Sequence, residues 1–87
     1  LNPYVTDLWI GLGFSSMHLH ELEEAQNYFE AAIAMDTLNP RGYYFASLCS
    51  KMRKDTQKAT NYCEIGLGLG NTEWDSSFAN LKQALGG

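Results

Sequence analysis

Lysine and arginine are absent from residues 1–40, although this stretch holds six acidic residues. Five of the six cationic residues of the chain lie between residues 41 and 58, namely Arg41, Lys51, Arg53, Lys54 and Lys58. The net charge of −4 argues against nucleic acid as a partner. The uneven charge is consistent with solvated helix faces, the simpler interpretation, or with a surface that orients a partner.

The sequence also lacks a signal-peptide pattern and any apolar run long enough to span a membrane, so we expect no direct membrane insertion. It has only two cysteines, Cys49 and Cys63, and both lie in apolar helical patterns. Buried thiols in a reducing cytoplasm are therefore expected rather than a disulfide. The opening Leu-Asn-Pro is not typical of a natural start, so residues 1–87 are interpreted as a single-domain fragment.

Residues that would support catalysis or metal binding are scarce. His18 and His20 are two positions apart, a spacing that does not bring side chains together on a helix, and nothing completes a metal set. Cys49 lies in an internal sequence repeat, and that position explains it better than a nucleophilic role does. The glycine runs lack the Lys and Ser/Thr of a phosphate loop. We expect no catalytic residue, no metal and no cofactor, and a protein that is not an enzyme.

The chain instead contains an internal repeat. The segment AQNYFEAAI at 25–33 returns as ATNYCEIGL at 59–67, and the same shift also aligns Ser16 with Ser50 and Trp9 with Tyr43. A 34-residue period with helical patterning indicates tetratricopeptide repeats (TPRs), which are helix–turn–helix units. The signature order of that repeat is carried here by Trp9, Leu12, Gly13, Ala25, Phe29 and Ala32.

The predicted fold class is all-α, with TPR helical hairpins stacked in a right-handed solenoid. Two repeats, at about 6–36 and about 40–70, are followed by a C-terminal capping helix at about 75–85. Small residues such as Gly13 and Ala25 would let helices approach, while Trp9, Leu12 and Phe29 would fill the remaining space. A second Leu-Asn-Pro at 38–40 makes residues 1–3 resemble the tail of an upstream unit.

Helices are expected at about 6–19, 21–36, 41–53, 56–67 and 75–85. Thr6 or Asp7 would cap the first helix, Asp55 or Thr56 the fourth, and Asp75 or Ser76 the fifth. Pro40 suits the start of the third helix. The glycine-rich run 66–70 is expected to fray the end of the fourth.

The first helix of each unit should line a concave groove. The side chains that face the groove, here called the inward columns, would be Asp7, Ile10, Phe14, Met17 and His18 in the first unit and Arg41, Tyr44, Leu48, Lys51 and Met52 in the second. An apolar face that the repeat does not need for its own core suggests a peptide-binding groove, with burial by the last helix or by another copy of the chain as the alternative. Asp7 and Arg41, at the ends of these columns, could set the direction of a bound peptide.

The segments LWIGLG at 8–13 and NPRGYYFA at 39–46, followed by Cys49, resemble a narrower family, the class II chaperones of bacterial type III secretion. The resemblance covers residues 8 to about 67. It implies a bacterial cytoplasmic protein that holds hydrophobic translocators before export. It also implies that an extended Pro-x-Leu-x-x-Pro-type segment of the client binds in the groove.

The first repeat and the N-terminal helix of that family are missing here. Ser47 and Leu48 replace the small and acidic residues that the family has in this segment. A homodimer is therefore left open. The predicted groove residues are Asp7, Ile10, Phe14, Met17, Arg41, Tyr44, Leu48 and Met52. The alternative function is a generic TPR scaffold that joins proteins through its convex face or edges.

Overall fold

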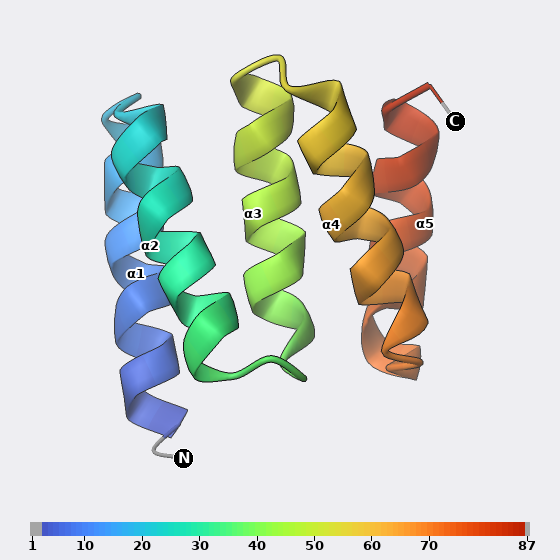
Figure 1. The fold of residues 1–87 in the computed structure, drawn as a ribbon, viewed down its shortest axis with the longest axis horizontal. Helices are drawn as coiled ribbons and strands as arrows, with labels where there is room; N and C mark the ends of the chain where they lie inside the picture. Colours follow the sequence, from blue (N-terminus) through green and yellow to red (C-terminus); the bar gives the residue numbers. More distant parts are fainter. Residues whose placement is uncertain (1–2, 87) are drawn as a thin grey trace.

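The computed structural model describes residues 3–86, and within that range it contains five α-helices and no strand. They are α1 (Pro3–His18), α2 (Leu22–Met35), α3 (Pro40–Met52), α4 (Thr56–Gly68) and α5 (Thr72–Ala84). Successive helices run in opposite directions, and short turns join them (Figure 1). The all-α expectation is confirmed. The first Leu-Asn-Pro copy, read as the tail of an upstream unit, begins outside the described residues.

The helices form two layers around the central helix α3. In Figure 1, α2 covers α1 and α4 covers α5, and each of these pairs is in contact. α3 packs on α2 and α4, and it also contacts α1 and α5. Among the odd-numbered helices, α3 therefore adjoins both α1 and α5, and the predicted groove residues of α1 and α3 lie on neighbouring helices.

Two of the predicted helix starts were wrong, because α1 and α5 each begin three residues earlier than expected. Thr6 is only 2% exposed and lies inside α1, as does Asp7, so neither residue caps that helix. The cap of α5 is Asn71, whose side-chain oxygen accepts from the backbone N–H of Glu73 at 3.0 Å. Asp75 was taken for the cap because aspartate suits both a cap and the first turn, where it stands here.

The starts of α3 and α4 agree with the prediction, which placed Pro40 at the beginning of the third helix and Asp55 among the candidate caps of the fourth. Asn39 accepts from the N–H of Arg41 at 3.0 Å, and Pro40 occupies the first helical position, where no N–H is needed. Asp55 caps α4 by accepting from the N–H of Lys58 at 3.1 Å. Local chemistry alone therefore fixes these two helix starts.

The two turns inside the hairpins have the same backbone shape. His20 has a φ of 61°, and Lys54, at the equivalent position of the second repeat, has a φ of 64°. The N–H of Glu21 bonds to the carbonyl of Ser16 at 2.8 Å, and the N–H of Asp55 bonds to that of Ser50 at 2.9 Å. A non-glycine residue with positive φ is uncommon, so the recurrence of this geometry is specific.

α4 ends at Gly68, inside the glycine-rich run 66–70 and one residue beyond the expected end. Gly66 is buried, and a Cβ placed on it would overlap the ring of Phe78. Phe78 is fully buried against α4, with Tyr43, Cys63 and Leu81 in the same cluster. Gly66 thus serves close packing between α4 and α5, and Gly70, with a φ of 69°, follows the end of the helix.

Small residues lie at the helix crossings, as predicted. Ala25, Ala46 and Ala59 are 0% exposed, and Ala32 is 1% exposed. Leu12 was expected to fill the core, but this is wrong: it is 38% exposed. Its counterpart in the second repeat, Ala46, is covered because α3 packs against α2. Within residues 3–86, no helix occupies the corresponding side of α1.

Candidate functional site

Four partly buried aromatic side chains form a row across the odd-numbered helices. We call Phe14 of α1, Phe45 and Tyr44 of α3, and Trp74 of α5 the aromatic row. The ring centroids of Phe14 and Phe45 lie 4.4 Å apart, and those of Tyr44 and Trp74 lie 5.3 Å apart. Tyr44 and Phe45 contact each other edge to face at 5.5 Å. Such arrangements are favourable for aromatic pairs, so the row is a continuous chain of stabilising ring contacts among partly exposed side chains.

The aromatic row rests on two phenylalanines that are fully buried. Phe29 of α2 contacts both Phe14, at 6.1 Å, and Phe45, at 5.7 Å. Phe78 contacts Tyr44 at 5.6 Å and Trp74 at 6.4 Å. The rings of the row are thereby held in place by the core. A ligand that contacted them would meet a preorganised surface.

The predicted groove residues have different environments. Ile10 is only 5% exposed and belongs to the core, so it offers little area to a ligand. Met17 and Leu48 are partly buried beside the aromatic row, and Met52 is 44% exposed. His18 is exposed, and its ring stacks on Phe14 at 6.5 Å. Of the predicted groove residues, Phe14 and Tyr44 are linked by the ring of Phe45, which contacts both.

Asp7 and Arg41, which were expected to direct a bound peptide, bind each other. The Arg41 guanidinium donates to an Asp7 carboxylate oxygen at 2.5 Å, and the two side chains are 37% and 50% exposed. These residues occupy the same position in the two repeats, and their ion pair links α1 to α3. Because the two charges offset each other, this pair offers a peptide little net charge.

Sequence reasoning missed Phe45 and Trp74. Phe45 directly follows Tyr44, and on a helix neighbouring positions point about 100° apart, so a single inward column excluded it. Trp74 fell outside the expected fifth helix because that helix begins at Thr72 rather than at 75. An Asn-capped start at Asn71 would have placed Trp74 and Phe78 four positions apart, on one helix face.

A polar cluster joins α2 and α4 away from these aromatic contacts. The carboxylate of Glu30 accepts from the Tyr62 hydroxyl at 2.7 Å and from the Gln26 amide at 3.2 Å, and it pairs with Lys58 at 2.9 Å. Burial raises the pKa of Glu30, but these bonds together outweigh it, so the net pKa is lowered. Burial and the bond to Glu30 raise the pKa of Tyr62. The cluster has a structural role, because its charges are already satisfied.

Both cysteines are free thiols, 0% exposed, as expected. The Cys49 thiol donates to the carbonyl of Leu22 and the Cys63 thiol to that of Phe78. Burial raises the pKa of each thiol, which favours the unreactive protonated form. No three His, Cys, Asp or Glu side chains come together as metal ligands in the described part of the chain.

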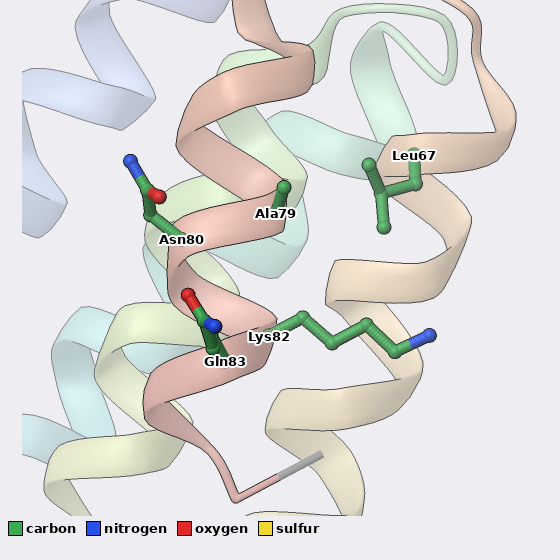
Figure 2. Close-up of a pocket in the computed structure, with 5 residues that line it drawn as sticks. All are labelled: Leu67, Ala79, Asn80, Lys82 and Gln83. Atoms are coloured by element: carbon green, nitrogen blue, oxygen red, sulfur yellow. The ribbon is translucent and has the colours of Figure 1, made fainter.

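Two open hollows lie elsewhere. One, of about 390 Å³, is lined by Leu67, Ala79, Asn80, Lys82 and Gln83 (Figure 2). In Figure 2, Asn80 and Gln83 point away from α4, while Lys82 reaches toward it, so the polar groups do not converge on one point. The other, of about 420 Å³, lies beside Glu21, Glu23 and Glu24 at the start of α2. Neither contains a residue of the aromatic row.

None of the helices described between residues 3 and 86 is both long and apolar enough to cross a membrane. Comparison of the chain with protein-family models, with curated proteins and with solved structures found no match. Arguments about its function therefore depend on the residues themselves, and above all on the aromatic row.

Proposed function

We propose that the chain consists of two tetratricopeptide units closed by α5, and that it binds an extended apolar segment of a client protein on the aromatic row. The recurrence of the sequence pattern, and of the turn geometry at His20 and Lys54, supports the repeat assignment. The resemblance to class II chaperones of type III secretion supports a hydrophobic translocator as the client. The proposed place of action is the bacterial cytoplasm.

The observation that carries this proposal is the continuity of the aromatic row across three helices. Contacts of 4.4 to 6.3 Å link its four rings without interruption from α1 to α5. An extended peptide suits such a surface, because it can place alternate side chains on successive rings. Burying apolar area there contributes about 25 cal/mol per Å², and ordering of the peptide offsets much of it. Moderate affinity with release is the expected result.

Peptide titration tests the proposal. A labelled peptide with a Pro-x-Leu-x-x-Pro core is titrated against the protein, with a scrambled peptide as reference. Trp74 is part of the row and Trp9 is not, so a Trp9→Phe background reports binding through Trp74 fluorescence alone. Tyr44→Ala should weaken binding about tenfold, as for a central interface aromatic. The matched control is Leu38→Ala, since Leu38 is 76% exposed in the turn before α3.

Phe14 contacts the buried ring of Phe29 and Tyr44 contacts that of Phe78, so alanine at either position also removes packing on the core. Phe14→Leu retains bulk and separates the two effects, and circular dichroism melts monitor folding in each variant. If neither the Tyr44 nor the Phe14 variants change the affinity, or if the scrambled peptide binds equally well, the aromatic row is not a peptide site.

A second candidate, the generic scaffold, is favoured by the outer face of α1. Leu8 is 60% exposed, Leu12 38% and Leu19 70%. Leu8 and Leu12, four positions apart, lie on one side of α1, and Leu19 directly follows the helix. The counterparts of Leu8 and Leu12 on α3 are Gly42 and Ala46, which are buried where α3 packs on α2. A helix that packed on α1 as α2 packs on α3 would cover these leucines.

The two candidates make opposite predictions for two variants. A Leu8→Glu, Leu19→Glu double variant should abolish capture of a folded helical partner and leave peptide binding unchanged. Tyr44→Ala should weaken peptide binding and leave capture of the folded partner unchanged. Loss of a folded partner in the leucine variant, with no peptide binding in the unchanged protein, would favour the scaffold over the chaperone.

A further inference from the structure

Three of the six cationic side chains form ion pairs within the described residues, those of Arg41, Lys58 and Lys82. The other three, Lys51, Arg53 and Lys54, form no ion pair with any residue between 3 and 86, and all are exposed. Lys51 lies in the last turn of α3, and Arg53 and Lys54 lie in the turn between α3 and α4. Three cations without an ion pair therefore lie close together in the chain, and Asp55 is the one acidic residue directly beside them.

Lys51 differs from its two neighbours because it lies on the same side of α3 as Tyr44 of the aromatic row. It comes seven residues after Tyr44 and three after Leu48, a spacing that places the three side chains on one side of a helix. Arg53 is the C-cap of α3, and Lys54 lies in the turn with a φ of 64°. At the position equivalent to Lys51, α1 has the partly buried Met17, so this position carries a charge only on α3.

We infer that the segment bound on the aromatic row carries an acidic residue beside its apolar part, and that Lys51 binds this carboxylate. The inference rests on the proposed function and names the chemistry of its client segment. Arg41 cannot take this role as readily, because Asp7 already pairs with its guanidinium. With its charge unpaired at the edge of an apolar surface, Lys51 selects for an acidic group and fixes the direction of the peptide.

Lys51 also lies in the last turn of α3, where a cation interacts favourably with the helix dipole. That interaction contributes to stability alone and does not depend on the sequence of the peptide. A preference for acidic peptides therefore separates the binding role from the structural one.

The test uses three labelled peptides that share one Pro/Leu-rich core. One has two aspartates at its amino end, one has two aspartates at its carboxyl end, and the third has asparagines at both ends. At low ionic strength, we expect one aspartate peptide to bind about two- to fivefold more tightly than the asparagine peptide, as for a single exposed ion pair. Lys51→Gln should remove this difference without changing affinity for the asparagine peptide.

The matched control is Lys54→Gln, which changes the net charge equally three residues away but lies beyond the end of α3, off the side of the helix that carries Tyr44. The preference for aspartate should persist in this control. Equal losses in the Lys51 and Lys54 variants would mean diffuse attraction and would overturn the inference, as would equal binding of all three peptides. If no peptide binds and Tyr44→Ala has no effect, the proposed function itself fails.

Discussion

Gly13 lies against the ring of Phe29 so closely that a Cβ on Gly13 would stand 2.5 Å from a ring carbon. In the second hairpin, Ser47 and Cys63 occupy the equivalent positions. Both are 0% exposed, and the Ser47 hydroxyl donates to the carbonyl of Ala59 at 2.6 Å. A larger residue on the odd-numbered helix thus accompanies a smaller one on its partner, which keeps the volume of the crossing similar.

Gly13→Ala should therefore destabilise the protein, although alanine is the better helix former. Phe29 is fully buried and has no free space in which to move, so overpacking is expected to cost about 1–3 kcal/mol. Gly11→Ala is the control, because nothing lies within 4 Å of a Cβ there and the residue is exposed. That variant should gain about 0.5–1 kcal/mol. Urea unfolding measures both, and a neutral Gly13→Ala would contradict the packing argument.

Stability should fall in acid because of Glu30. Its pKa in the folded protein is lowered from 4.5, so its contribution to stability is present above that value and is lost as the pH falls through the folded pKa. Urea midpoints measured between pH 7 and pH 3 should decline less steeply for Glu30→Gln than for the unchanged protein. Glu64→Gln, at the equivalent position in α4, is the control, since Glu64 has only the 3.5 Å contact with Lys82. Parallel pH profiles for all three proteins would exclude this role for Glu30.

The sequence predicted the all-α class and the middle helix starts because those features depend on local chemistry. Helical periodicity, a proline such as Pro40 at a helix start and an aspartate cap such as Asp55 act within a few neighbouring residues, so they can be recognised without knowing the fold. The starts of α1 and α5 were harder to predict from the sequence. Several residues near each start could serve as caps, and the choice at α5 depends on which frame buries Phe78 against Gly66.

The candidate site was only partly predictable for a related reason. Phe14 and Tyr44 follow from the repeat columns, but the burial of Ile10 depends on how closely α1 approaches its neighbours. The pairing of Asp7 with Arg41 is a contact between two repeats that no local pattern encodes. Whether a column faces a ligand or a neighbouring helix is decided by packing, and this is why Phe45 and Trp74 emerged only with the structure.

The two thiols should resist modification in the folded protein. Cys49 and Cys63 are 0% exposed, and burial raises the pKa of each, so little thiolate is present and no reagent can reach it. A thiol-reactive chromophore at neutral pH should report no fast reaction in buffer and two thiols in denaturant. Rapid labelling of one thiol in buffer would show that its hairpin opens locally, and a Cys63→Ser variant would identify which.

The cost of removing a leucine should depend sharply on its place. Leu81 is 5% exposed beside Tyr43 and Phe78, so Leu81→Ala should cost about 2–5 kcal/mol and loosen α5. Leu8 and Leu19 are 60% and 70% exposed, and Leu8→Ser or Leu19→Ser should change stability by about 0.5 kcal/mol or less. Urea unfolding compares the three variants. Because exposed leucines promote association, the two serine variants should also scatter less light at high concentration. A large stability loss in either would mean that α1 buries these side chains in solution, most simply against another copy of the chain, and its dependence on protein concentration would then reveal that association.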